Sequence, residues 1–314
     1  MKASAMSRKS NRGAGLFALF CLLLVGSLLA LSLVVAKFAD AAGAPRLMFL
    51  MVAMTGGGLI LFGIAVSRHQ PMPMTLRTLE YAVVSGALFA LPNALAFLAV
   101  RHVGAGFISL SFAFPILLTW ILAVGLGLEK LSLLRFAGVS FGLAGGVVLA
   151  IAKAGGADGA WLWAALVLAM PVVIAIANIY RTLRWPAEAG PIFLAALMLI
   201  GGAIALLPFV IMFEGADARA LFLAPAALNL VLAEALVFAV LYLFYFVLQR
   251  LAGPVYLSQI GTVAALVGTL VAIFALGEGP PPNLAAAAAL ITLGTALFQR
   301  GAPAAISSGD KPAA

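Results

Sequence analysis

Two long stretches without Asp, Glu, Lys or Arg constrain this chain more than any other feature. One covers residues 102–128, between Arg101 and Glu129, and the other covers residues 251–277, between Arg250 and Glu278. Each is 27 residues long and mainly apolar. A helix of that length rises about 40 Å at about 1.5 Å per residue, which exceeds the roughly 30 Å hydrocarbon core of a bilayer. Both stretches therefore predict membrane-spanning helices.

The two stretches belong to a pattern that occurs twice, at an offset of 149 residues. The matching pairs are Arg101 and Arg250, Gly104 and Gly253, Ser109 and Ser258, Glu129 and Glu278, and Gly145 and Gly294. No gap is needed to align the two copies at these positions. The repeat predicts one fold that is built from two similar halves.

Composition places the whole chain in the membrane class. Hydrophobic residues make up 65% of the 314 residues and charged residues only 9%, whereas a soluble domain carries roughly 25% charged residues. The net charge of +8 comes from basic residues that lie singly or in small groups between apolar runs. This distribution indicates membrane topology, so lipid is the expected environment and nucleic acid is not an expected partner.

Several kinds of enzyme chemistry lack the residues they need. The single cysteine, Cys21, lies in an apolar run, so no intramolecular disulfide or cysteine-based metal site can form. The chain has no G-x-x-x-x-G-K-[ST] nucleotide-binding loop and no evident Ser-His-Asp set. His69 and His102 fall at opposite membrane edges in the topology derived below. We therefore expect no enzyme activity, no cofactor and no metal.

Charges and turn residues divide the chain into ten apolar segments. Their approximate ranges are 16–35, 46–67, 78–100, 104–127, 132–152, 160–180, 190–213, 227–249, 254–276 and 283–300. A signal peptide is the alternative for the first segment, because basic residues precede it and Ala39-Asp40-Ala41 resembles a cleavage site. The segment has about 20 residues, whereas a signal core has about 7 to 15, which favours a retained helix.

The distribution of basic residues predicts the orientation of these segments. With the N-terminus inside, thirteen of the 18 Lys and Arg residues lie on the inner side and five on the outer side. Both termini are then cytoplasmic by the positive-inside rule. Five spans separate the two copies, so the repeat is inverted, which is the architecture of many alternating-access transporters. We expect an all-α, multi-pass protein of the cell inner membrane, with five-helix repeats at 14–152 and 160–300 and tails at 1–13 and 301–314.

The first half of the chain resembles a known family. Residues 78–152 are similar to the second half of an EamA-like domain of the drug/metabolite transporter superfamily. A mid-span proline, Pro115, is followed by Glu129 at the membrane edge, and Gly138 and Gly145 lie nine and sixteen residues beyond that glutamate.

The second half shows the same pattern more faintly. Leu276-Gly277-Glu278 and Gly294 are in place, whereas Ala264 and Ala287 stand where the first copy has Pro115 and Gly138, and a proline run follows Glu278. Two EamA-like repeats imply a carrier for small organic solutes such as amino acids or other metabolites, often an exporter.

One face of the eighth segment carries the clearest candidates for a solute pathway. Its residues are Glu234, Phe238, Tyr242, Tyr245 and Gln249. Successive spacings of 4, 4, 3 and 4 residues place them within a face about 80° wide. A polar and aromatic face with an ionisable group is costly in lipid, so it should point into the bundle or a wet cavity.

Other segments contribute further polar candidates for the pathway. They are Asn93, Ser109, Trp120, Asn178, Ser258 and Thr262. Prolines near some of them, such as Pro92 and Pro171, free backbone groups that can bind a solute. A hydrogen bond between helices is the alternative role for each Asn, Ser or Thr.

The sequence thus predicts a secondary transporter of small organic metabolites that works by alternating access and acts as an exporter. Glu234 is the only acidic residue well inside an apolar segment, and we hypothesise that it couples transport to protons or binds a cationic group of the solute. The alternative is a non-transporting membrane subunit or receptor that retains the transporter fold. The sequence does not identify the solute or the oligomeric state.

The charge distribution generates a test of topology. A reporter protein fused after Ala314 should behave as cytoplasmic, because both termini are predicted to lie on the inner side. Alkaline phosphatase and green fluorescent protein fusions measure this, since the first is active outside and the second fluoresces inside. Phosphatase activity from the C-terminal fusion would mean that an odd number of segments spans the membrane.

Overall fold

The computed structural model describes residues 2–154, 160–277, 279 and 283–301. Every regular element within these residues is a helix. The elements are α1 (Lys2–Ala41), α2 (Arg46–Ser67), α3 (Leu76–Val103), α4 (Ala105–Ser111), α5 (Pro115–Gly125), α6 (Leu133–Ala154), α7 (Ala160–Leu183), α8 (Pro191–Phe213), the 3-10 helix η1 (Gly215–Arg219), α9 (Ala220–Leu223), α10 (Pro225–Leu257), α11 (Ile260–Phe274) and α12 (Leu284–Arg300). The predicted all-α class is confirmed for this part of the chain.

Seven helical stretches are long and apolar enough to cross a membrane. They are Gly15–Ala41, Arg46–Ser67, Leu76–Val103, Ala105–Gly125, Trp161–Leu183, Pro191–Phe213 and Pro225–Leu257. Three shorter apolar helices, Leu133–Gly145, Ile260–Phe274 and Ala285–Phe298, coincide with the remaining predicted segments. Large apolar side chains such as Leu59, Ile204 and Leu232 are more than half exposed in the middle of their helices, which suits a surface covered by lipid. The chain is a multi-pass helical membrane protein.

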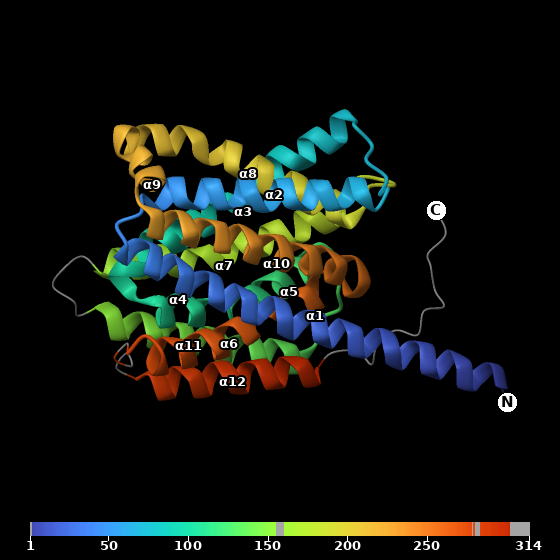
Figure 1. Ribbon diagram of the computed structural model, residues 1–314. Helices are drawn as coiled ribbons and strands as arrows, with labels where there is room; N and C mark the ends of the chain where they lie inside the picture. The colour runs from blue at the N-terminus through green and yellow to red at the C-terminus, as the bar shows by residue number, and fades with distance from the viewer. Residues whose placement is uncertain (1, 155–159, 278, 280–282, 302–314) are drawn as a thin grey trace.

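Proline and threonine mark where several helices begin. Pro115, Pro191 and Pro225 each occupy the first turn of a helix, where the missing N–H would have no partner within the helix. Thr75 precedes α3, and its hydroxyl accepts a hydrogen bond from the Thr78 amide at 3.2 Å. α1 is helical from Lys2, so the segment predicted as a tail extends this helix, which projects beyond the bundle (Figure 1).

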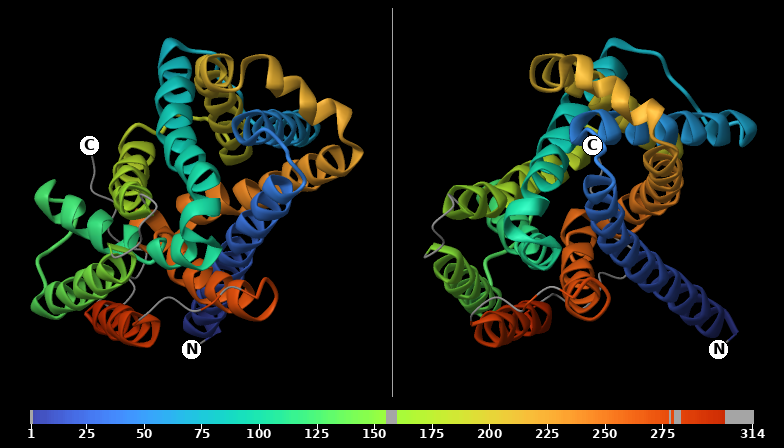
Figure 2. Two further views of the ribbon diagram at one scale, coloured as in Figure 1. Left: turned by 90° about the vertical axis from the view of Figure 1, so that its left-hand side faces the viewer. Right: turned by 60° about the vertical axis from the view of Figure 1, so that its left-hand side comes forward.

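The helices form a bundle in which each half of the sequence packs on the other. α3 packs on α7 and α8, and α10 packs on α1 and α2. α2 packs on α8, and α6 packs on α12 at the opposite side of the bundle (Figure 2). α1, α4, α5, α7 and α11 lie between these two groups (Figure 2). The core is therefore made mainly of contacts between segments that are far apart in the sequence.

α2 and α8 cap each other's first turn. The Glu214 carboxylate, directly after α8, accepts hydrogen bonds from the Leu47 and Met48 amides of α2, both at 2.8 Å. Gln70, shortly after α2, accepts with its side-chain oxygen from the Ile192 and Phe193 amides of α8, at 3.1 and 3.4 Å. The first amides of a helix have no acceptor within the helix, so each side chain satisfies donors that an apolar environment would leave unpaired.

Two helices predicted as continuous are interrupted. Gly104 separates α3 from α4 with φ 82° and ψ 157°, and Gly253 bends α10 with φ 77° and ψ 177°. Only glycine adopts this conformation without strain, and the two glycines are partners in the 149-residue repeat. The segment predicted at 104–127 is broken again between Ser111 and Pro115, and the one predicted at 254–276 is broken between Leu257 and Ile260.

Small residues let α6 and α12 approach backbone to backbone. A Cβ atom added to Gly138 would lie 2.6 Å from the Gly294 carbonyl oxygen, and one added to Gly294 would lie 2.6 Å from the Gly138 carbonyl oxygen. One turn pair further along, a Cβ on Gly145 would lie 3.0 Å from the carbonyl oxygen of Ala287. Close approach of this kind drives helix association in lipid, where burying apolar surface gives no advantage.

This contact predicts a selective effect of adding one methyl group. Gly294→Ala should destabilise the protein by about 1–3 kcal/mol, because the new Cβ meets backbone atoms that cannot move aside. Gly63→Ala is the matched control, since Gly63 is helical and has no atom within 4 Å of the added position. Thermal unfolding in detergent measures both, and equal unfolding temperatures for the two variants would contradict the packing account.

Candidate functional site

A cavity lies in the middle of the bundle, where the broken helices meet α3, α7 and α10. It holds about 670 Å³ of space between atoms, including its open mouth. One group of lining residues is apolar and includes Leu29, Phe112, Ile174, Leu257 and Ile260. The other is polar and consists of Asn93, Asn178, Arg181, Tyr242, Tyr245 and Ser258. We call this space the central cavity.

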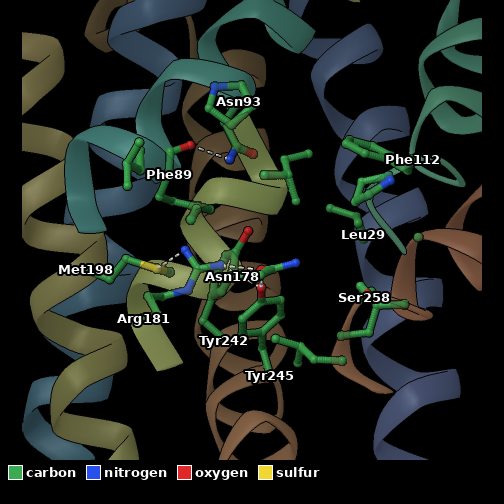
Figure 3. Close-up of a pocket in the computed structure, with 18 residues that line it drawn as sticks. Leu29, Phe89, Asn93, Phe112, Asn178, Arg181, Met198, Tyr242, Tyr245 and Ser258 are labelled. Atoms are coloured by element: carbon green, nitrogen blue, oxygen red, sulfur yellow. Dashed lines mark hydrogen bonds between the residues drawn. The ribbon is translucent and has the colours of Figure 1, made fainter. Parts of the chain in front are cut away.

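Three side chains form a hydrogen-bonded cluster on one side of the central cavity (Figure 3). The Arg181 Nη2 atom donates to the Asn178 Oδ1 atom at 2.7 Å and to the Tyr245 hydroxyl at 2.8 Å. The Tyr245 hydroxyl in turn donates to Asn178 Oδ1 at 2.8 Å. Asn178 and Arg181 are three residues apart on α7 and so share a face, while Tyr245 comes from α10. The Arg181 guanidinium also lies 5.4 Å from the centre of the Tyr245 ring.

Arg181 was not predicted as a site residue. The sequence places it at the inner edge of the sixth segment, where it counts as one of the basic residues that set topology. The structure instead buries it, with 3% of its surface exposed. Its position three residues after Asn178 was the available signal, because two polar side chains at that spacing on a membrane helix occupy one face.

The wall opposite the cluster is formed by the broken helices (Figure 3). The Ser258 hydroxyl donates to the Val255 carbonyl at 2.7 Å, at the point where the helix before α11 ends. Gly261 lies directly against the Phe112 carbonyl, and a Cβ atom at this position would collide with that carbonyl. Phe112 and Gly261 are separated by 149 residues, so the two broken segments cross at equivalent positions of the repeat.

Five of the ten predicted residues line the central cavity. They are Asn93, Asn178, Tyr242, Tyr245 and Ser258. The structure also confirms that the polar face of α10 points into the bundle, since Glu234, Phe238, Tyr242 and Gln249 are all buried. Asn93 donates with its side-chain amide to the Phe89 carbonyl of its own helix at 2.8 Å.

The other five predicted residues lie outside the cavity lining. Ser109 packs against Gly268, and Trp120 packs edge-on against Phe298 with ring centres 5.8 Å apart. Thr262 is half-buried. Gln249 donates to the Thr182 hydroxyl at 3.2 Å and lines a separate hollow beside Arg250.

Glu234 is the fifth of these residues and is fully buried between α10 and α1. Its Oε1 atom accepts a hydrogen bond from the Ser32 hydroxyl, and its Oε2 atom has no hydrogen-bond partner among the described residues. Glu234 and Gln249 are 15 residues apart, about 22 Å along a helix, so the polar face is longer than the cavity and extends past both ends of it. Tyr242, two turns from Glu234, is the residue of this face that connects it to the cavity.

Two further hollows lie at opposite ends of the bundle. One is lined by Thr182, Trp185, Gln249 and Arg250, at the end where α7 and the main part of α10 finish. The other is lined by residues near the end of α1 and the end of α3, including Asp40, Arg101 and His102. The central cavity therefore lies between two polar depressions.

Comparisons with known proteins identify the fold and nothing more specific. No protein-family model matches the chain, and no curated protein does. A solved crystal structure of a protein aligns with a TM-score of 0.63 over 92% of this chain and 98% of that chain, at 20% sequence identity. Identity this low shows a shared fold alone, and the shared fold extends over nearly the whole of both chains.

Proposed function

We propose that this protein is a secondary transporter that moves small organic metabolites across the cell inner membrane and acts as an exporter. The observation that carries this proposal is the central cavity, a partly polar and aromatic space at the crossing of two broken helices inside a helical membrane protein. Interrupted helices at mid-membrane are typical of solute sites in secondary transporters, because the freed backbone groups can bind a solute.

The proposed architecture has ten spans in two inverted halves, and reciprocal contacts support it. In an assembly with twofold symmetry, a contact from one half to the other is matched by the exchanged contact. Gly138 meets Gly294, and Gly145 meets Ala287, which is the same contact after exchange by 149 residues. The Glu214 and Gln70 caps of α2 and α8 are exchanged in the same manner. Glu278, the predicted partner of Glu129, lies outside the described residues.

The reciprocal packing also suits alternating access. α3 contacts α7 and α8, while α10 contacts α1 and α2, so the two halves interlock around the cavity. Rocking of one half against the other would open the cavity first toward one polar hollow and then toward the other. With both termini cytoplasmic, the hollow beside Arg250 faces inward and the one beside Arg101 faces outward. The resemblance to EamA-like repeats supports the same assignment and favours export.

Flux measurement tests the proposed function directly. Purified protein reconstituted in liposomes should move at least one member of a panel of radiolabelled amino acids and amphipathic organic acids, at a rate that saturates with concentration. Protein-free liposomes are the control for leakage. Binding of a solute without its movement would contradict transport and would favour a non-transporting receptor that retains the fold.

Glu234 generates a separate prediction about energy coupling. We propose that its buried carboxyl, held by Ser32, exchanges a proton during the transport cycle. Glu234→Gln keeps the size and the hydrogen bond to Ser32 but has no proton to exchange. Imposing a pH gradient on liposomes should accelerate transport by the wild type and leave the rate of this variant unchanged.

An exposed acidic residue provides the control for this experiment. Asp217→Asn in η1 removes one negative charge at the surface and should respond to the pH gradient as the wild type does. If Glu234→Gln transports at the wild-type rate with the wild-type response to pH, the carboxyl is structural and solute movement is coupled in another manner.

A further inference from the structure

We infer that the solute bound in the central cavity is an organic monoanion, with a carboxylate held by Arg181 and an apolar body held by the opposite wall. The inference rests on the proposed function only for the step in which this solute crosses the membrane. The site itself is argued from charge, hydrogen bonding and shape.

The charge of the cavity is unbalanced. Arg181 is the only charged side chain among the described residues that line it, and its hydrogen-bond partners are all neutral. Burying a charge without a counter-charge costs several kcal/mol, roughly, even after the surroundings relax. An anionic ligand in the cavity supplies the missing charge.

The other buried guanidinium in the described part of the chain shows the contrast. Arg135 is also nearly inaccessible, and its Nη1 atom contacts the Glu129 carboxylate at 3.1 Å. It lies over the Phe298 ring at 5.0 Å as well, so its surroundings resemble those of Arg181 in every respect except the acidic partner. This protein therefore balances one buried arginine internally and leaves the other, which faces the cavity, without an acid.

The hydrogen-bonding groups around Arg181 leave room for a carboxylate. A guanidinium has five N–H donors, and contacts to Asn178, Tyr245 and the Met198 sulfur account for three of them. The Met198 contact, at 3.7 Å, is to a weak acceptor, and the buried Nε atom has no partner among the described residues. The Tyr245 hydroxyl is one more donor beside these groups. A carboxylate is an acceptor with two oxygens, which matches this set of donors.

The rest of the lining defines the remainder of the ligand. Across from the cluster the wall consists of Leu29, Phe112 and Ile260, which suit an aliphatic or aromatic body (Figure 3). A single guanidinium balances one negative charge, so a phosphate or phosphonate dianion would remain unbalanced in this space. No Asp or Glu lines the described part of the cavity to receive a free ammonium group.

Matched sets of probes test the inference by binding alone. Phenylacetate, 4-methylpentanoate and indole-3-acetate are each compared with the neutral amide and the amine that have the same body, and phenylphosphonate serves as the dianion. Binding to purified protein in detergent is measured by isothermal titration. At least one carboxylate should bind, about tenfold or more tightly than its amide, because charge-assisted hydrogen bonds are stronger than neutral ones.

Substitution of Arg181 identifies the residue responsible. Arg181→Met should abolish the preference for the carboxylate over its amide, and Arg181→Lys should retain part of it because the charge remains. Arg184→Met is the control, since Arg184 lies three residues further on, is half exposed and pairs with Glu80 at 3.1 Å. This control should bind all probes as the wild type does. If Arg181→Met does not fold, the Arg181→Lys variant and the wild-type probe series still decide the outcome.

Distinct outcomes separate this inference from the proposed function. Failure of every carboxylate to bind, equal or tighter binding of the amide, amine or dianion, or an unchanged carboxylate preference in Arg181→Met would each overturn the anion site. Selective carboxylate binding without flux in liposomes would leave the anion site in place and contradict transport. Flux of a cationic or neutral solute without carboxylate selectivity would support transport and contradict the anion site.

Discussion

The need to satisfy every backbone N–H and C=O group inside an apolar environment governs this structure. Helices meet the need within themselves, so exceptions are expected only at helix ends and at breaks that are covered by protein or open into a cavity. Both kinds occur here. The free first-turn amides of α2 and α8 bond to Glu214 and Gln70, and the breaks near Phe112 and Ser258 lie at the central cavity.

Glycine determines how closely these helices can approach and where they can bend. Backbone contact at Gly138 and Gly294 joins α6 to α12, and the same lack of a side chain lets Gly261 lie against Phe112 where the broken helices cross. Gly104 and Gly253 have a different role, because their positive φ values turn the chain between consecutive helical segments. Packing and interruption thus depend on one residue type for two separate physical reasons.

The sequence predicted the helical class and the inward face of α10 because hydrophobicity and helical period determine both. It predicted Tyr242 and Tyr245 as cavity residues correctly, but placed Glu234 and Gln249 with them, since a helical face has no indication of where a cavity ends. Arg181 was missed for another reason. An arginine at the end of an apolar segment has the same sequence pattern whether it extends toward the interface or turns inward, and the residue that holds it, Tyr245, is 64 positions away.

The reciprocal caps of α2 and α8 limit how the protein can change shape. Each helix supplies, just beyond its own last turn, the acceptor for the other's first amides. Sliding either helix along its axis by even one residue, about 1.5 Å, would break the bonds at both ends at once. The pair therefore has a fixed axial register, and any motion that opens the cavity must come from tilting of the other helices around a pair that moves as one body.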